Sequence, residues 1–109
     1  MSLDRIFAAL GDPTRRAILA RLMQGEASVQ DLARPHDLSQ PAISKHLKVL
    51  ERAGLIATRI DAQSRPRHLR PEALALVDDW LGPFRAQWER RLDRLEGFLD
   101  DTDPERTDP

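Results

Sequence analysis

The residues best suited to carry chemistry lie between Leu38 and Gly54, in the string L-S-Q-P-A-I-S-K-H-L-K-V-L-E-R-A-G. At helical spacing, one face of this string carries an amide, a hydroxyl and three cations, namely Gln40, Ser44, Lys45, Lys48 and Arg52. Amides and hydroxyls can read the edges of bases, and cations attract phosphates, so the combination suits a nucleic-acid duplex. An ordinary surface helix with solvated lysines has a similar composition, so the neighbouring segments must decide between the two.

The same string predicts a helix with both ends marked. Ser39 can cap the free amides of the first turn, and Pro41 falls where its missing N–H costs nothing. Gly54 can take the left-handed conformation that ends a helix. Three apolar residues recur at i, i+4 and i+7 and predict a buried stripe, namely Ile43, Leu47 and Leu50.

The chain of 109 residues has few features that favour metal binding, catalysis or membrane insertion. It contains no Cys, which excludes disulfides and thiolate metal sites. We recognise no pair of carboxylates, no nucleophile beside a base and no glycine-rich phosphate loop, so we expect no enzyme. No apolar run approaches the ~20 residues of a membrane span. We therefore expect a soluble, cytoplasmic protein that does not enter a membrane.

Charge is distributed unevenly along the chain. The formal net charge is −1, yet residues 1–70 hold 12 Lys and Arg against 7 Asp and Glu, whereas residues 71–109 hold 5 against 11. Within residues 39–70 the balance is 7 basic to 2 acidic residues. A local basic patch matters more for duplex binding than total charge does, and here the patch coincides with the candidate helix.

Two helices are predicted before this string, and a third, short helix is predicted to form a helix-turn-helix with it. Residues 3–10 are amphipathic, and Asp12-Pro13 marks the start of a second helix. The buried face of that second helix is expected to hold Ile18, Leu19, Leu22 and Met23. Its arginines are expected to be solvated, with contact of one of them to a phosphate as the alternative; they are Arg15, Arg16 and Arg21. Ser28-Val-Gln-Asp31 is a capping signature for a third, short helix, and a tight turn from there to Ser39 makes a helix-turn-helix.

After Gly54 the periodicity changes from helical to alternating. Ile56, Thr58 and Ile60 alternate with smaller or polar residues, which predicts a strand, and residues 67–70 return as a second strand. The hairpin carries four arginines, namely Arg59, Arg65, Arg67 and Arg70. Beside a helix-turn-helix, a basic hairpin is typical of a wing that touches the minor groove or its phosphates. A plain edge hairpin whose arginines resist aggregation is the alternative.

Residues 72–99 return to helical character. An apolar stripe runs through about six turns and consists of Val77, Leu81, Phe84, Trp88, Leu92, Leu95 and Leu99. Gly82-Pro83 interrupts this segment, either as a break or as a kink. A second copy of the chain is the expected cover of so long a stripe, although part of it could fold back on its own domain. Residues 100–109 are acidic, and we expect them to be disordered.

The order of these elements resembles that of the ArsR/SmtB family of bacterial winged-helix repressors. Three strings carry the resemblance, namely L-G-D-P-T-R-R-A-I-L at 10–19, L-S-Q-P-A-I-S-K-H-L at 38–47 and L-E-R-A-G-L-I at 50–56. It extends from residue 3 to about residue 99. It implies a mainly α fold with a small β-hairpin, that is, a winged helix-turn-helix with a long C-terminal dimerisation helix.

The best-known members of that family release DNA when a metal binds, and one such metal site is built on a Glu-Leu-Cys-Val-Cys-Asp-Leu string. The matching residues 26–32 read E-A-S-V-Q-D-L, so Ser28 and Gln30 replace the two cysteines. A second site in relatives uses His and Asp on the C-terminal helix, where this chain has acids but no His, namely Asp78, Asp79, Glu89 and Asp93. The histidines lie instead on the turn, the candidate helix and the wing, as His36, His46 and His68. The resemblance therefore implies the branch without metal sensing, and we expect no metal and no cofactor.

Together these features predict a homodimeric, sequence-specific repressor of transcription that binds an inverted repeat in double-stranded DNA. Residues 1–99 would form the DNA-binding domain, including the dimerisation helix at about 72–99. The candidate DNA contacts are Ser39, Gln40, Pro41, Ser44, Lys45, Lys48, Arg59, Arg65 and Arg67. The candidate dimer contacts are Leu3, Phe7, Leu81, Phe84, Trp88, Leu92 and Leu95. The alternatives are a winged-helix module that binds protein, and a metal-responsive repressor with a non-cysteine site; no effector is identified.

Overall fold

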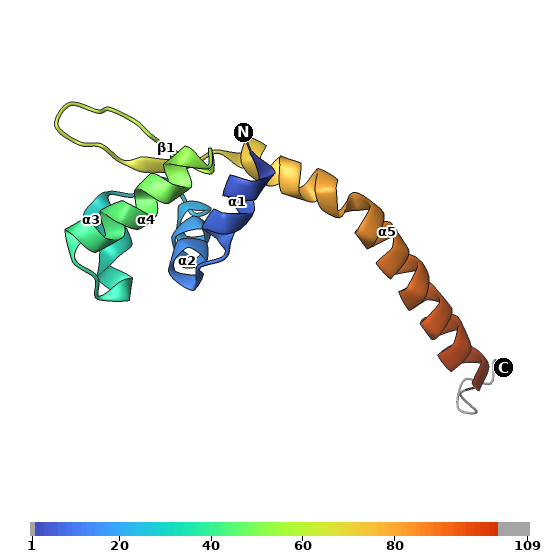
Figure 1. Cartoon of the computed structure of the whole chain (residues 1–109). Coiled ribbons are helices and arrows are strands. Elements are labelled where there is room, and N and C mark those ends of the chain that lie inside the picture. The colour runs from blue at the N-terminus through green and yellow to red at the C-terminus, as the bar shows by residue number, and fades with distance from the viewer. Residues whose placement is uncertain (1, 103–109) are drawn as a thin grey trace. The chain divides into compact units, whose positions relative to one another are not determined.

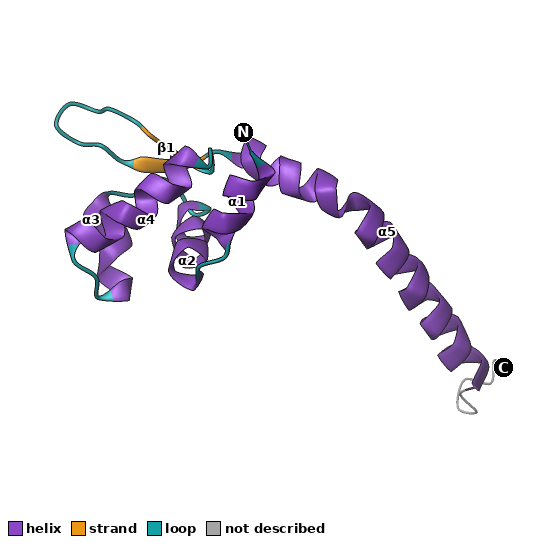
Figure 2. Ribbon diagram, viewed as in Figure 1, coloured by secondary structure: helices purple, strands orange, loops and turns teal. Residues whose placement is uncertain are grey.

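The computed structural model describes residues 2–102, with side chains through residue 99, and is mainly helical with one small hairpin (Figure 1, Figure 2). In chain order the elements are α1 (Leu3–Leu10), α2 (Pro13–Leu22), α3 (Val29–Ala33), the 3₁₀ turn η1 (Arg34–His36), α4 (Gln40–Arg52), β1 (Ile56–Thr58), β2 (Arg67–Leu69) and α5 (Pro71–Thr102). The chain forms two compact units, one up to Val77 and one from Asp78 onward, so the boundary falls within α5.

The predicted N-caps of α2 and α3 are confirmed. The side chain of Asp12 accepts a hydrogen bond from Arg15 N at 3.1 Å, and Ser28 accepts one from Asp31 N at 3.1 Å. These bonds satisfy amides that a first helical turn leaves free. Met23 was expected on the buried face of α2 but is 76% exposed. The prediction was wrong because α2 ends at Leu22, and Met23 is the residue that follows it.

The core of the first unit surrounds α4. This helix packs against α1, α2, α3 and β1. The largest side chains that are fully buried are Ile6, Ile18, Leu32, Ile43, Leu47, Leu50, Leu55 and Ile56. The four helices α1 to α4 and the strand β1 thus all contribute to one cluster, which fixes the orientation of α4 within the unit.

The hairpin is smaller than predicted, and the chain adds a third segment to it. β1 and β2 pair antiparallel, with Thr58 opposite Arg67. On the side of β2 that does not face β1, Ala27 pairs with Arg67 through two backbone hydrogen bonds of 2.8 and 3.1 Å. Ile60, which alternates with Ile56 and Thr58, is 72% exposed because β1 ends at Thr58.

α5 is one continuous helix with Pro83 inside it, so Gly82-Pro83 does not divide the segment into two helices. Within the second unit, the rings of Trp80 and Phe84 lie 4.9 Å apart, and Arg85 donates to Asp78 at 2.5 Å. The helix continues to Thr102, three residues into the segment that we expected to be disordered. The remainder of that segment, residues 103–109, lies outside the described residues.

Candidate nucleic-acid interface

α4 has the two faces that the sequence predicts. Ile43, Leu47 and Leu50 are 0%, 1% and 0% exposed. The polar residues expected on the other side are exposed or half-buried; they are Gln40, Ser44, Lys45, Lys48 and Arg52. Because three buried side chains anchor the helix, its polar face is presented from a rigid element.

The start of α4 is organised by a cap and a tight turn. The Ser39 hydroxyl accepts a hydrogen bond from Ala42 N at 3.3 Å, and Pro41 occupies the first turn, as predicted. Asp37 precedes them in the left-handed region, with φ of 52°, which redirects the chain after η1. α3, this turn and α4 make the expected helix-turn-helix. Gly54 has a φ of 77°, so the predicted left-handed residue after α4 is also confirmed.

Arg59 is bound within the protein. Its guanidinium donates to both carboxylate oxygens of Glu26, at 3.0 and 2.5 Å, and lies 3.5 Å from Asp61 Oδ2. The hydrogen bond from Arg59 lowers the pKa of Glu26, and the same bond raises the pKa of Arg59. This contact ties the end of β1 to the segment before α3. The predicted DNA contact of Arg59 remains a prediction. To make that contact, the guanidinium would have to release or share its internal partners.

Arg67 is also engaged within the protein. Its side chain is 18% exposed, and Nε lies 3.3 Å from Glu51 Oε1, close enough for an ion pair but not aligned as a hydrogen bond. The same carboxylate oxygen accepts a 2.5 Å hydrogen bond from Thr58 Oγ1. Glu51 therefore connects α4 to both strands of the hairpin. One signal in the sequence could have identified this residue, since Glu51 is one of two acids in the otherwise basic segment 39–70.

The Arg65 side chain has no hydrogen bond or ion pair among residues 2–99, and the residue is exposed in the loop between the strands. A polar groove of about 470 Å³ brings this loop together with the starts of α3 and α4. Its lining consists of Ser28, Val29, Gln30, Gln40, Gln63, Ser64, Arg65 and Arg67. Three predicted DNA contacts, Gln40, Arg65 and Arg67, thus share one groove. It also includes Gln30, Gln63 and Ser64, which the sequence analysis missed because they are uncharged and lie outside the predicted recognition helix.

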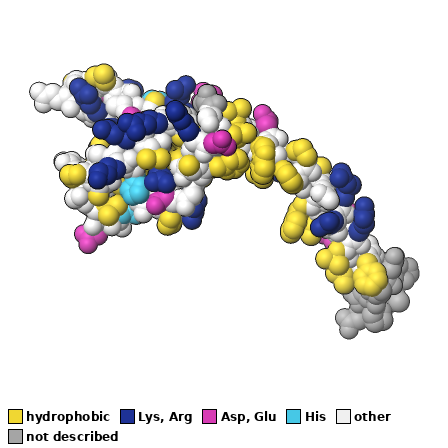
Figure 3. Space-filling model, in the orientation of Figure 1, with side chains coloured by type: hydrophobic (Ala, Val, Ile, Leu, Met, Phe, Trp, Pro, Cys, Tyr) yellow, Lys and Arg dark blue, Asp and Glu magenta, His cyan; other side chains and the backbone are white. Residues whose placement is uncertain are grey.

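Lys and Arg side chains are exposed on the unit that carries α4 and the hairpin and also along α5, where apolar side chains are exposed beside them (Figure 3). In the second unit the predicted dimer residues are 38–63% exposed; they are Leu81, Phe84, Trp88, Leu92 and Leu95. In the first unit Leu3 is half-buried and Phe7 is 37% exposed. So much exposed apolar surface on one helix is unusual for a folded monomer.

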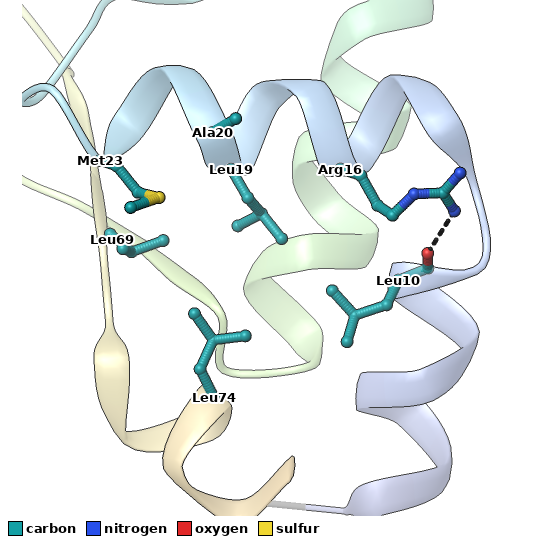
Figure 4. Close-up of a pocket in the computed structure, with 7 residues that line it drawn as sticks. All are labelled: Leu10, Arg16, Leu19, Ala20, Met23, Leu69 and Leu74. Carbon is teal, nitrogen blue, oxygen red and sulfur yellow. Dashed lines mark hydrogen bonds between the residues drawn. The ribbon is translucent and has the colours of Figure 1, made fainter. Parts of the chain in front are cut away.

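A separate apolar pocket of about 210 Å³ lies between α1, α2, β2 and the first turns of α5 (Figure 4). It is lined by Leu10, Arg16, Leu19, Ala20, Met23, Leu69 and Leu74. Arg16 was expected to be solvated; it is exposed, but its guanidinium also donates to the Leu10 carbonyl at 2.8 Å. The pocket shares no residue with the polar groove.

Neither a cluster of metal ligands nor a membrane-spanning helix occurs among the described residues. No group of three or more His, Asp or Glu residues in that part of the chain is placed to hold a metal ion. No helix there is both long enough and apolar enough to cross a membrane.

Comparison with known proteins identifies the family. A family model described as "Bacterial regulatory protein, arsR family" matches residues 12–58. The HTH-type transcriptional regulator Rv2034 of Mycobacterium tuberculosis is 41% identical over 97 residues, which cover 89% of this chain and 88% of that protein. The transcriptional repressor SdpR of Bacillus subtilis is 40% identical over 55 residues, covering 50% of this chain and 61% of that protein.

A solved structure of an ArsR family transcriptional regulator matches with a TM-score of 0.73 at 41% identity, covering 80% of this chain and 96% of that chain. The match with the Mycobacterium tuberculosis regulator spans most of both chains, and the family model begins at the α2 cap and ends with β1. The helix-turn-helix and hairpin described above fall within these matches. The chain therefore belongs to the ArsR family of bacterial regulatory proteins and is a helix-turn-helix transcriptional regulator.

Proposed function

We propose that this regulator is a cytoplasmic homodimeric repressor that binds an inverted-repeat operator in double-stranded DNA. The observation that carries the proposal is the exposed polar and cationic face of α4, which lies opposite three buried anchors and whose first residue, Gln40, lines the same groove as Arg65. A helix presented in this way fits the major groove, while a hairpin beside it reaches the adjacent backbone.

We assign different roles to the residues of α4. Gln40 and Ser44 carry the amide and hydroxyl that can discriminate base edges, and Lys45 and Lys48 would contact phosphates or guanine. Gln40 is exposed at the first turn, which usually points deepest into the groove. Ser39 and Pro41 would lie against the backbone, with the Ser39 hydroxyl also capping the helix.

Within the hairpin we divide the three predicted arginines into two groups. Arg65 would contact phosphate or the minor groove, because its side chain has no partner within the described residues. Arg59 and Arg67 would mainly hold the wing in place through Glu26 and Glu51. If Arg59 or Arg67 also contacts a phosphate, its guanidinium would be shared between that phosphate and Glu26 or Glu51.

Dimerisation would be mediated chiefly by the apolar face of α5. Leu81, Trp88 and Leu95 are at least 38% exposed and recur every seven residues, so a second copy could cover them along one stripe. Leu3 and Phe7 of α1 would add to this contact. Two copies of α4 would then meet half-sites about one helical turn apart, roughly 34 Å.

Repression rather than activation is favoured by the name of the Bacillus subtilis relative and by simple occupancy of the operator. The proposal includes no catalytic activity and no cofactor, and it leaves the inducing signal open. If Lys45, Lys48 and Arg65 of both subunits each meet one phosphate, the slope of log affinity against log salt should be about −5.

The test is selection of bound sequences from a random duplex pool by the purified chain, followed by footprinting and a reporter assay with the selected site. We expect an enriched inverted repeat, salt-dependent affinity and lower reporter expression. The proposal fails if no sequence is enriched and no duplex binds at low salt, which would favour a module that binds protein. Raised reporter expression would overturn repression but not DNA binding.

A further inference from the structure

Arg15 joins the end of α1 to the start of α2. Its guanidinium donates from Nε to the Ala9 carbonyl at 2.7 Å and from Nη2 to the Ala8 carbonyl at 3.1 Å. Carbonyls in the last turn of a helix lack partners within the helix, and a cation there is favourable. The expectation that Arg15 is solvated was therefore wrong, since these bonds fix its guanidinium at the α1–α2 junction.

The same guanidinium contacts the flank of α4. Arg15 Nη1 lies 3.2 Å from Nδ1 of His46, a residue 31 positions away that is half-buried on the helix. A guanidinium can only donate, so this contact is a hydrogen bond only when Nδ1 accepts, that is, when the imidazole is neutral and carries its proton on Nε2. The contact therefore depends on the protonation state of His46.

The geometry points to Arg15 and His46 as positioning residues for DNA binding: neutral His46 fixes the flank of α4 against the α1–α2 junction, and protonation releases it. This inference rests on the proposed DNA binding by α4. Ile43, Leu47 and Leu50 keep the helix in the core in either state, so the contact adjusts the pose of α4 rather than maintaining the fold.

Among the described residues, the charged groups that interact with His46 are Arg15 and Asp12, both at the start of α2. The Arg15 guanidinium lies beside Nδ1, and a protonated imidazole would have no lone pair there to accept from it and would place a second cation beside it. The backbone hydrogen bond from Arg15 is the main cause that lowers the pKa of the Asp12 carboxyl, and the nearby charge of His46 contributes less. From α1 the groups that meet Arg15 are backbone carbonyls, which do not titrate.

The matched variants are His46→Gln and His46→Leu. Gln offers an oxygen that accepts from Arg15 at every pH, whereas Leu offers no acceptor. The probe is a fluorescein-labelled duplex selected by the wild-type protein from a random pool, titrated by anisotropy from pH 8.0 to 5.5. His36→Gln is the control, because it makes the same substitution at a histidine in η1, outside this contact. Thermal melts followed by circular dichroism confirm that each variant is folded.

At pH 8.0 we expect His46→Gln to bind like the wild type and His46→Leu to bind roughly three- to tenfold more weakly, the effect of removing one hydrogen bond on the population of the competent pose. Wild-type affinity should fall more steeply with acid than that of His46→Gln, and His36→Gln should keep the wild-type slope. The inference is overturned if His46→Leu binds like the wild type, or if wild-type affinity rises on acidification relative to His46→Gln.

A second readout does not need DNA. In protein labelled with ¹⁵N-histidine, the nitrogen shifts at pH 8.0 should show the Nε2–H tautomer for His46, and Arg15→Gln should shift the tautomer balance. A dominant Nδ1–H tautomer in the wild type would overturn the inference whatever the DNA results. Failure of the proposed function is distinct from both results, because the wild type would then bind no duplex at pH 8.0.

Discussion

Replacing Trp88 by Ala should dissociate the proposed dimer. Trp88 is 63% exposed on α5. A tryptophan buries about 150–250 Å² in full, so covering the exposed part removes roughly 100–150 Å² from water in each subunit. At about 25 cal/mol per Å² this contributes about 2.5–4 kcal/mol per subunit. Allowing for the area that Ala retains, the dimer should lose about 4 kcal/mol, on the order of a thousandfold in its dissociation constant.

Sedimentation equilibrium over a wide concentration range measures this constant. Arg90→Ala is the matched control, because Arg90 is exposed on the same helix but lies two residues from Trp88, on a different face. The control should leave the dimer unchanged, and circular dichroism should show that both variants keep their helices. If Trp88→Ala dimerises as tightly as the control, the α5 stripe is not the interface.

Three further outcomes are expected. Leu47→Ala should lower the free energy of unfolding by about 2–5 kcal/mol in urea titrations, because the side chain is 1% exposed in the core beneath α4; a decrease below about 1 kcal/mol would contradict this packing. The folded-state pKa of Glu26 lies below its ordinary value of 4.5 because Arg59 donates to it. The ion pair should therefore stabilise the wing above about pH 5 and cease to do so as the pH falls through the lowered pKa. Glu26→Gln should remove this pH dependence from hydrogen exchange of the hairpin amides. Micromolar zinc should change operator affinity by less than about twofold, ~0.4 kcal/mol, and a tenfold decrease would point to a metal-responsive repressor.

Much of the fold was predictable from signals that act over one or two helical turns. Asp12, Ser28 and Ser39 mark helix starts because their side chains bond to amides three residues ahead. The spacing of Ile43, Leu47 and Leu50 predicts which side of α4 is buried, and the structure confirms it. Such signals do not depend on the rest of the chain.

The contacts that arrange the candidate site were not predictable in this way. Glu26 meets Arg59 across 33 positions, and Arg15 meets His46 across 31, so neither pair leaves a local pattern. Ala27 joins the sheet through its backbone, which any residue could provide. Counting arginines identified the basic hairpin, but only the fold distinguishes Arg65, which is exposed, from Arg67, which is tied to Glu51.

The most direct test of the proposed DNA-binding mode compares Gln40→Ala with Arg65→Ala. Anisotropy titrations at several salt concentrations, on the selected operator and on a scrambled duplex, measure both affinity and salt slope. Gln40→Ala should weaken operator binding by ~1–3 kcal/mol and barely change binding to scrambled DNA, because it removes an interaction with a base. Arg65→Ala should weaken both alike and reduce the salt slope by about one unit for each phosphate that is no longer neutralised. If the two variants behave identically on both duplexes, the assigned division between base reading and phosphate binding is wrong.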